Sequence, residues 1–341
     1  MKIGILTGGG DAPGLNGIIE ASARVLLENG CEVVGIRDGF EGIFKGRVMP
    51  LNREAILNAH SQAGTLLGTS NRSSTAGREA EFVASYKKLG LEGLIVCGGD
   101  GTFAALAPLA GDVKIIGVPK TIDNDLRGTD ITFGYDTACA VVSESVDALR
   151  FTADAHSRVF VIEAMGRTAG WIALGGGLAS YADAILIPER PFSRPDLKQY
   201  ILRRQAEGRR GLTLVVSEGA FAQAESASVA FAVDAPQAER YGGMSFSLSR
   251  WIEKETGWES RHVVLGHLQR SRHPTTTDRF LTLAMGLEAA RMAMEKSWGH
   301  AVVYRQGLVQ RAPLADFMGG PRLVTPDHRW VKMAQALGTY I

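Results

Sequence analysis

Short apolar runs alternate with longer helical patterns along this chain, and the alternation limits the folds open to it. The runs are apolar on consecutive residues, a pattern typical of parallel strands covered on both faces. Helical patterns such as Gly17–Glu28 and Thr137–Ala148 lie between them. The sequence therefore predicts an α/β fold built from βαβ units. The expected strands are Lys2–Thr7, Glu32–Ile36, Gly93–Cys97, Lys114–Val118, Arg158–Glu163, Ala184–Ile187, Leu212–Val216, His262–Leu265 and Ala301–Tyr304.

Nine expected strands are many for one open sheet, and the first four make a compact group. We therefore expect two doubly wound, Rossmann-like, three-layer domains with a break within Gly134–Asp136. The first domain would span 1–135 plus about 268–300, and the second 136–267 plus about 301–341. The stretch Phe221–Tyr241 is rich in Ala, Ser and Gln and predicts a surface excursion or an inserted helix.

Composition excludes several classes of protein. The 341 residues are 45% hydrophobic and 21% charged, as in ordinary globular domains, and the net charge is only +1. Such a balance gives no global field for nucleic acid or an anionic membrane, so we expect neither partner. The three cysteines form no C-x-x-C pair, which argues against disulfides and a zinc site. With no signal-like start and no apolar run of about eighteen residues, we expect a cytoplasmic protein.

A glycine-rich turn follows the first expected strand. The segment Thr7–Gly14 reads TGGGDAPG and leads into a helical pattern. Glycines let the backbone approach a ligand closely, and a helix N-terminus adds N–H groups and positive dipole, so the turn predicts a phosphate cradle. Pro13 stands where a dinucleotide fingerprint would have its third glycine, which excludes that motif. A tight turn with no ligand is the alternative.

A second glycine turn follows the third expected strand. Cys97–Thr102 reads CGGDGT and places Asp100 between glycines at the carboxyl end of a strand, where open α/β sheets bind ligands. A carboxylate beside a phosphate pocket is suited to Mg²⁺, so we expect Asp100 to hold that ion. An ordinary Asp-Gly turn is the alternative. Kinases of NAD and of diacylglycerol also use G-G-D-G-T.

Two carboxylates follow the fourth expected strand. In Pro119–Asp125, PKTIDND, Asp123 and Asp125 lie two residues apart and would point the same way in extended chain. An acceptor hydroxyl must lose its proton as it attacks phosphorus, and Asp123 is the best base for that step. A second group of cations brackets the later strands, with Arg158 and Arg167 around one and Arg261–Arg270 around another. Arginine forks fit phosphate oxygens.

Together these segments resemble the 6-phosphofructokinase family, from Lys2 to about Arg279. The motifs TGGGDAPGLNG, GTLLGTSNR, GGDGT, PKTIDND, EAMGRTAG, SEG and VLGHLQR occur in the order of that family. The resemblance implies transfer of a phosphoryl group from Mg-ATP to the 1-hydroxyl of fructose 6-phosphate, in the cleft between two domains. It also implies a homotetramer with shared active sites, a homodimer being the alternative.

The resemblance to this family implies a role for individual residues of the sequence. Asp123 would be the base, with Thr121, Asp125 and Arg167 beside it, and Arg158 and Arg261 would reach the sugar phosphate of a neighbouring subunit. The residues implied for the donor are Gly10, Arg72, Ser73, Gly99, Asp100, Gly101, Thr102 and Lys120. Those implied for fructose 6-phosphate are Thr121, Ile122, Asp123, Arg158, Met165, Gly166, Arg167, Glu218, Arg261, His267, Leu268, Gln269 and Arg270.

The chain departs from the bacterial ATP-using pattern in ways that keep the donor open. Lys120 stands where that branch has glycine, which is compatible with diphosphate, whereas Gly101 stands where diphosphate users commonly have aspartate. We expect ATP, with diphosphate as the alternative. Glu20 replaces an effector-binding arginine, and would pair with Arg24 and present negative charge to an incoming anion. A kinase of the NAD or lipid type and a non-catalytic sugar-phosphate sensor are the remaining alternatives.

Overall fold

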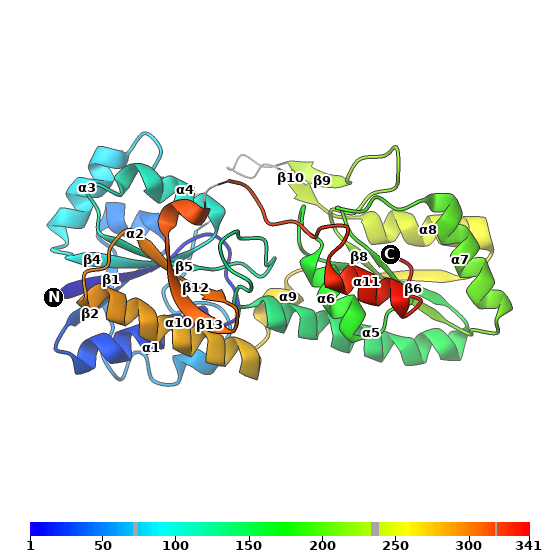
Figure 1. The fold of residues 1–341 in the computed structure, drawn as a ribbon, viewed down its shortest axis with the longest axis horizontal. Helices are drawn as coiled ribbons and strands as arrows, with labels where there is room; N and C mark the ends of the chain where they lie inside the picture. The colour runs from blue at the N-terminus through cyan, green and yellow to red at the C-terminus, as the bar shows by residue number, and fades with distance from the viewer. Residues whose placement is uncertain (71–73, 233–238, 318) are drawn as a thin grey trace. The chain divides into compact units, whose positions relative to one another are not determined.

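The chain folds into two compact units, each with its own sheet (Figure 1). The computed structural model describes residues 1–70, 74–232, 239–317 and 319–341. Unit 1 comprises Met1–Ile122, Leu126–Thr137 and Arg270–Pro321, and unit 2 comprises Asp123–Asp125, Ala138–Gln269 and Arg322–Ile341. The predicted α/β fold with two sheet-bearing domains is confirmed.

Unit 1 is built on a seven-stranded sheet in the order β13-β12-β5-β4-β1-β2-β3. Its inner strands are parallel, and the edge strands β3 and β13 are antiparallel to their neighbours. Of the inner strands, β1, β4 and β5 are almost wholly buried, which explains their continuous apolar runs. The strands are β1 Lys2–Thr7, β2 Glu32–Ile36, β3 Val48–Pro50, β4 Gly93–Gly98, β5 Ile115–Pro119, β12 His300–Arg305 and β13 Leu308–Pro313.

Helices cover both faces of this sheet. Helices α1 and α10 pack side by side on one face, and α2, α3 and α4 lie on the other, where Phe40 and Phe82 stack edge to face in a buried cluster (Figure 1). The helices of the unit are α1 Leu15–Glu28, α2 Phe40–Lys45, α3 Glu79–Lys88, α4 Asp100–Leu106 and α10 Thr276–Met294, with short 3-10 helices at Ala59–Ser61, Ala107–Leu109 and Leu314–Phe317.

Unit 2 is built on a four-stranded parallel sheet in the order β11-β6-β8-β7. The strands β6 and β8 are buried throughout. A separate antiparallel ribbon, β9 Val229–Ala232 with β10 Glu239–Tyr241, occupies the Ala- and Ser-rich stretch. The sheet strands are β6 Val159–Ala164, β7 Ala184–Leu186, β8 Leu212–Ser217 and β11 Ser260–Val264. The helices are α5 Tyr135–His156, α6 Trp171–Ala179, α7 Arg194–Ala206, α8 Met244–Thr256, α9 Leu268–Ser271 and α11 Arg329–Ala336.

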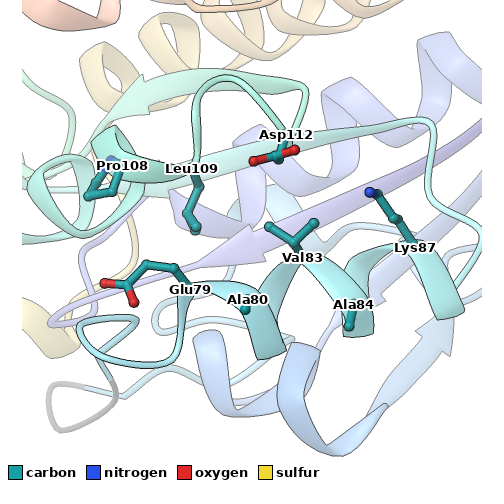
Figure 2. Close-up of a pocket in the computed structure, with 8 residues that line it drawn as sticks. All are labelled: Glu79, Ala80, Val83, Ala84, Lys87, Pro108, Leu109 and Asp112. Atoms are coloured by element: carbon teal, nitrogen blue, oxygen red, sulfur yellow. The ribbon is translucent and has the colours of Figure 1, made fainter.

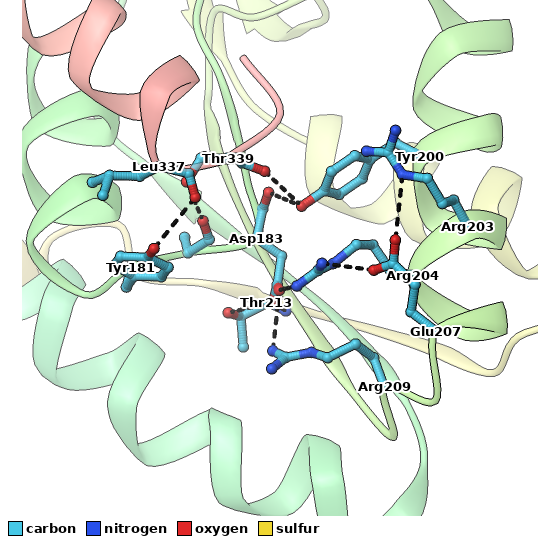
Figure 3. Close-up of polar contacts among 12 residues, drawn as sticks. Tyr181, Asp183, Tyr200, Arg203, Arg204, Glu207, Arg209, Thr213, Leu337 and Thr339 are labelled. Atoms are coloured by element: carbon cyan, nitrogen blue, oxygen red, sulfur yellow. Dashed lines mark hydrogen bonds and ion pairs between the residues drawn. The ribbon is translucent and has the colours of Figure 1, made fainter.

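The last residues of the chain are tied to the outer strand β7 (Figure 3). Tyr340 N donates to Asp183 O, and Ile185 N donates to Tyr340 O, which forms a parallel bridge at the free edge of β7. The hydroxyl of Tyr200 donates to the Asp183 carbonyl at 2.7 Å. The carboxylate of Asp183 accepts the Thr213 N–H and an Arg209 N–H. The C-terminal segment therefore completes this edge of the sheet, as its open hydrogen-bonding groups require.

Three expectations about the chain's organisation need correction. Residues 301–321 belong to unit 1, because β12 pairs with β5 and β13 extends the same sheet, so their predicted place in the second domain was wrong. The units divide at Thr137 and Ala138, just beyond Gly134–Asp136, and Asp123–Asp125 is counted with unit 2. The described part of 221–241 contains strands and no inserted helix.

None of the helices in the described ranges is long and apolar enough to cross a membrane.

Candidate active site

Three predicted turns meet at one edge of the unit 1 sheet. Strands β1, β4 and β5 are adjacent and parallel, so the segments that follow Thr7, Gly98 and Pro119 emerge at the same edge. Backbone hydrogen bonds continue beyond the strands, from Gly8 N to Cys97 O at 2.8 Å and from Lys120 N to Gly98 O at 2.9 Å. The two glycine turns and the start of the PKTIDND segment therefore form one continuous surface.

Side chains from other segments lie close to the backbone of the first glycine turn. Gly9 has φ of +76°, a left-handed conformation that favours glycine. A Cβ on Gly8 would lie 3.0 Å from the Thr102 side chain, and one on Gly10 would lie 3.0 Å from Arg270 Nη1. Arg270 Nη1 in turn donates to the carbonyl of Asp11 at 2.5 Å. The turn is thus enclosed by side chains from two other segments.

The second turn presents an exposed carboxylate. Asp100 opens helix α4, and its Oδ1 accepts the Gly101 N–H at 2.7 Å. Thr102 is buried and packs so closely that a Cβ on Gly98 would lie 2.4 Å from it, so this glycine is required. A Cβ on Gly101 would meet open space. Mg²⁺ usually binds one or two carboxylates together with phosphate oxygens, and Asp100 with open space beside it fits that donor set.

Lys120 lies against the first glycine turn. It is buried, and its Nζ donates to the carbonyl of Gly10. The same Nζ would lie 3.2 Å from a Cβ on Gly9. Burial raises the pKa of the neighbouring Cys97 thiol to about 12, against a smaller lowering by the charge of Lys120. Cys97 therefore stays protonated and is a packing residue, while Lys120 brings its charge to the turn.

The PKTIDND segment passes from one unit to the other. The Thr121 carbonyl accepts a hydrogen bond from Thr132 at 2.7 Å, and Ile122 is fully buried, both within unit 1. Asp123 and Asn124 are buried, and Asn124 has φ of +53°.

Arg322 holds the second half of this segment and was missed by sequence reasoning. Its backbone N–H donates to Asp125 O at 2.6 Å, and its guanidinium donates twice to Asn124 O, at 2.7 and 3.2 Å. The guanidinium also lies over the Trp171 ring, 4.5 Å from its centroid. Asn124 is 198 residues away in the sequence, so no local pattern could indicate this contact. The one local feature of Arg322 is its position after Gly319, Gly320 and Pro321.

In unit 2, the carboxyl ends of β6 and β8 bring Arg167 and Glu218 together. Gly166 has φ of +141° and Arg167 φ of +53°, which turns the chain back after β6. Glu218 Oε1 accepts the Arg167 N–H at 3.0 Å, and a Cβ on Gly219 would lie 1.8 Å from the Arg167 carbonyl. Burial raises the pKa of Glu218 to about 7; the Arg167 hydrogen bond opposes this rise and the charge of Asp123 adds to it. Glu218, Asp123 and Arg167 are therefore neighbours.

The VLGHLQR segment divides between the two units. Gln269 is fully buried, and its Oε1 accepts the Met165 N–H at 3.3 Å, which joins this segment to the end of β6. His267 and Leu268 are exposed just before it. Arg270 is counted with unit 1, where it contacts the first glycine turn as described above. The structure thus associates Arg270 with the donor turn in addition to its predicted sugar-phosphate role.

Arg158 and Arg261 lie apart from the other predicted residues of unit 2. They are at the amino-terminal ends of β6 and β11, and both pair with Glu259, Arg158 at 2.9 Å. The hydrogen bond from Arg158 holds the pKa of Glu259 below its usual value. A strand of six residues separates Arg158 from Met165, about 20 Å of extended chain. These two arginines do not belong to the Arg167–Glu218 cluster of their own chain.

Two predicted donor residues, Arg72 and Ser73, lie outside the described residues. A groove of about 520 Å³ in the described part of unit 1 involves no predicted site residue (Figure 2). It is lined by Glu79, Ala80, Val83, Ala84, Lys87, Pro108, Leu109 and Asp112.

Glu20 does not present its charge to solvent as expected. It is 2% exposed, and Arg24 Nη2 binds its Oε1 at 2.6 Å, which confirms the predicted pairing. His60 donates its backbone N–H to Oε2 at 2.7 Å, and its ring Nδ1 lies 2.8 Å from the same oxygen. Burial favours a higher pKa of Glu20, but these hydrogen bonds outweigh it and lower the pKa. The expectation of an outward negative charge was wrong, because both oxygens are occupied within the fold.

Comparison with known proteins places these features in a family. The family model described as Phosphofructokinase matches residues 2–293. The chain is 39% identical to "ATP-dependent 6-phosphofructokinase 2" of Streptomyces coelicolor, over 96% of this chain and 97% of that protein. It is 40% identical to "Pyrophosphate--fructose 6-phosphate 1-phosphotransferase" of Amycolatopsis methanolica, with the same coverage of 96% and 97%.

Solved structures agree with this assignment. Phosphofructokinase of Pichia pastoris in the T-state superposes with a TM-score of 0.83 at 31% identity, over 93% of this chain; the chain spans 35% of that larger protein. The pyrophosphate-dependent phosphofructokinase of Marinobacter aquaeolei shares the fold, with a TM-score of 0.84 at 20% identity over 100% of this chain and 92% of that one. The chain described here belongs to the phosphofructokinase family.

Proposed function

We propose that this protein is an ATP-dependent 6-phosphofructokinase, which transfers a phosphoryl group from Mg-ATP to the 1-hydroxyl of fructose 6-phosphate. The observation that carries the proposal is the common edge of β1, β4 and β5, at which two glycine turns, Asp100 and the segment leading to Asp123 emerge. A donor phosphate needs the turns, a magnesium ion needs Asp100, and an acceptor hydroxyl needs a base. The identity of 39% to an ATP-dependent relative over nearly the whole chain supports the same activity.

In the proposed mechanism, Asp123 takes the proton of the acceptor hydroxyl as its oxygen attacks the terminal phosphorus of ATP. The bond from that phosphorus to its bridging oxygen breaks, and ADP leaves. Arg167 would neutralise charge that develops on the transferred group, and Thr121 and Asp125 would orient the base. Asp100 would hold Mg²⁺, which when bound screens the negative charge of the donor phosphates. Glu218, held beside Arg167, would accept a hydrogen bond from a sugar hydroxyl.

The sugar phosphate is assigned to unit 2 and its border. Met165, Gly166 and Gln269 are joined by the hydrogen bond between Gln269 and Met165, and exposed His267 and Leu268 come directly before Gln269. We assign fructose 6-phosphate to this group, with Arg270 as a phosphate ligand. Arg158 and Arg261 are assigned to the phosphate of a neighbouring subunit, since neither lies near Arg167 or Glu218 of its own chain.

Diphosphate is the second candidate donor, and two observations favour it. Lys120 brings a buried ammonium to the first glycine turn, where it would hold a departing phosphate. The Amycolatopsis relative named for pyrophosphate is 40% identical. ATP ranks first because the open space at Gly101 leaves room for a nucleotide. We further propose a cytoplasmic homotetramer that binds neither nucleic acid nor membranes.

The deciding experiment is a coupled assay with fructose 6-phosphate and Mg²⁺, supplied with ATP in one arm and diphosphate in the other. A higher kcat/KM for ATP than for diphosphate supports the ATP-dependent activity, and a higher kcat/KM for diphosphate supports the diphosphate-dependent one. Absence of product with both donors would favour a non-catalytic sugar-phosphate sensor, and phosphorylation of NAD or diacylglycerol in parallel reactions would indicate the other kinase classes that use G-G-D-G-T.

A further inference from the structure

Three successive carbonyl oxygens of the first glycine turn each accept a hydrogen bond from the side chain of a different segment. The donors are a threonine from the loop after the first 3-10 helix, the lysine after β5 and the arginine of α9. The three pairs are Thr69 Oγ1 with Gly9 O at 2.5 Å, Lys120 Nζ with Gly10 O, and Arg270 Nη1 with Asp11 O at 2.5 Å.

Each of these contacts fixes the orientation of a whole peptide unit. A peptide is planar and its C=O and N–H point in opposite directions, so holding the Gly9 carbonyl also sets the direction of the Gly10 N–H. This matters most at Gly9, because glycine in a left-handed conformation has more freedom to rotate than any other residue. Without such contacts, ordering the turn around a phosphate would cost conformational entropy.

Thr69 belongs to a set of threonines that joins its loop to β1. Thr7 Oγ1 donates to Gly68 O at 2.7 Å and lies 3.1 Å from Thr65 Oγ1. Thr69 Oγ1 contacts Thr7 O at 3.2 Å in addition to Gly9 O. The loop is therefore anchored twice on β1, and Thr69 alone of the three threonines reaches the turn. Arg72, assigned to the donor, follows three residues later in the sequence.

We propose that Thr69 is a positioning residue for the phosphoryl donor, which acts by fixing the Gly9–Gly10 peptide; this inference rests on the proposed kinase function. Thr69 contacts no donor atom itself. Its hydroxyl prepares the backbone N–H groups of the turn for phosphate. Either ATP or diphosphate would use the same peptide, so the inference is independent of which donor is preferred.

The test compares Thr69→Val, which keeps the shape but removes the hydroxyl, with Thr69→Ser, which keeps the hydroxyl. Thr69→Val should lower kcat/KM for the donor by roughly 2- to 13-fold, the range of one net hydrogen bond, and leave the KM of fructose 6-phosphate within about twofold. Thr69→Ser should restore donor kcat/KM to near wild type. Thr65→Val is the matched control, since it loosens the same loop on β1 without touching a turn carbonyl.

A second readout needs no turnover. Calorimetric titration with magnesium ADP and with magnesium diphosphate should show a similar loss of affinity in Thr69→Val. The proposal would be overturned if Thr65→Val lost as much donor affinity as Thr69→Val. It would also be overturned if Thr69→Val raised the KM of both substrates equally, or if folded Thr69→Val bound the donor as wild type does. If Thr69→Val does not fold, Thr69→Ala replaces it. A wild type that binds the probe in a Thr69-dependent manner but phosphorylates no sugar would refute the proposed function and leave this inference standing.

Discussion

Glu218 Oε1 accepts the backbone N–H of Arg167 at 3.0 Å, so a carboxylate at the end of β8 is fixed to the turn after β6. Burial raises the pKa of that carboxylate to about 7. A carboxyl group with a higher pKa in the folded than in the unfolded state binds its proton more tightly when folded. Its effect on stability is therefore most favourable below about pH 4.5, and is lost as pH rises toward 7.

The Glu218→Gln variant should reveal this linkage. It cannot ionise, so its stability advantage over wild type should grow between pH 4.5 and 7 and then level off, at no more than about 3 kcal/mol. Thermal unfolding at closely spaced pH values measures the difference. Glu255→Gln is the control: a hydrogen bond from Lys198 lowers the pKa of Glu255, so its difference from wild type should stay constant between pH 4.5 and 7 and change only at lower pH, with the opposite sign. A constant difference across this range would show that Glu218 titrates normally.

Replacing Asp123 by Asn should remove the proposed base. We expect kcat to fall by roughly 10²- to 10⁴-fold, with modest change in the KM of either substrate, because proton transfer is lost while the side-chain shape is kept. Steady-state kinetics at neutral pH provide the measurement, and Asp112→Asn, an exposed acid outside the site, is the control. Retention of most of the wild-type kcat would assign the base to another residue.

Gly101→Asp should impair the use of ATP more than the use of diphosphate. The position beside Asp100 is open, and an aspartate there would add bulk and negative charge where a nucleotide passes. The ratio of kcat/KM for the two donors, measured in wild type and variant, reports the change. A wild type that prefers diphosphate, or a variant whose ratio does not move, would remove the argument from Gly101.

Control by ADP and phosphoenolpyruvate should be weak or absent. The family resemblance implies that Glu20 and Arg24 stand at two effector-binding arginine positions, and in the structure Glu20 pairs with Arg24. Arg209 is paired with Asp183 at 3.1 Å (Figure 3). Arg150 donates to the Tyr181 carbonyl at 3.2 Å. Arg24 and Arg209 are therefore each paired with a carboxylate within their own unit. Saturation curves for fructose 6-phosphate, with and without millimolar effector, should coincide in wild type, and Glu20→Gln should gain sensitivity. A large shift of the wild-type midpoint contradicts this expectation.

Subunit mixing tests the role of Arg261. Because Arg158 and Arg261 lie at the opposite strand ends from Arg167 and Glu218, we expect them to serve a neighbour's site. Inactive Asp123→Asn and Arg261→Ala subunits should then recover part of the wild-type activity when mixed, since some sites would contain neither change. Sedimentation establishes that mixed oligomers have formed. Mixed oligomers without recovered activity would place Arg261 outside the shared site.

Local chemistry allowed much of this protein to be predicted from sequence. Consecutive apolar residues predicted β1, β4, β6 and β8 to within one residue at each end, because strands buried on both faces are mostly apolar. Glycines followed by an acid predicted the turns around Asp100, since only small residues permit such close approach.

Other features depended on contacts between distant parts of the chain. Strand β12 belongs to the unit 1 sheet because it pairs with β5. The local sequence of a strand does not indicate which strand it will pair with. Arg322 binds the Asn124 carbonyl, and Glu20 is enclosed by His60 from 40 residues away. The sequence determined which residues are candidates to hold phosphate, metal and proton. Tertiary structure decided which of their charges remain available, because burial and hydrogen bonding arise only when separate segments pack together.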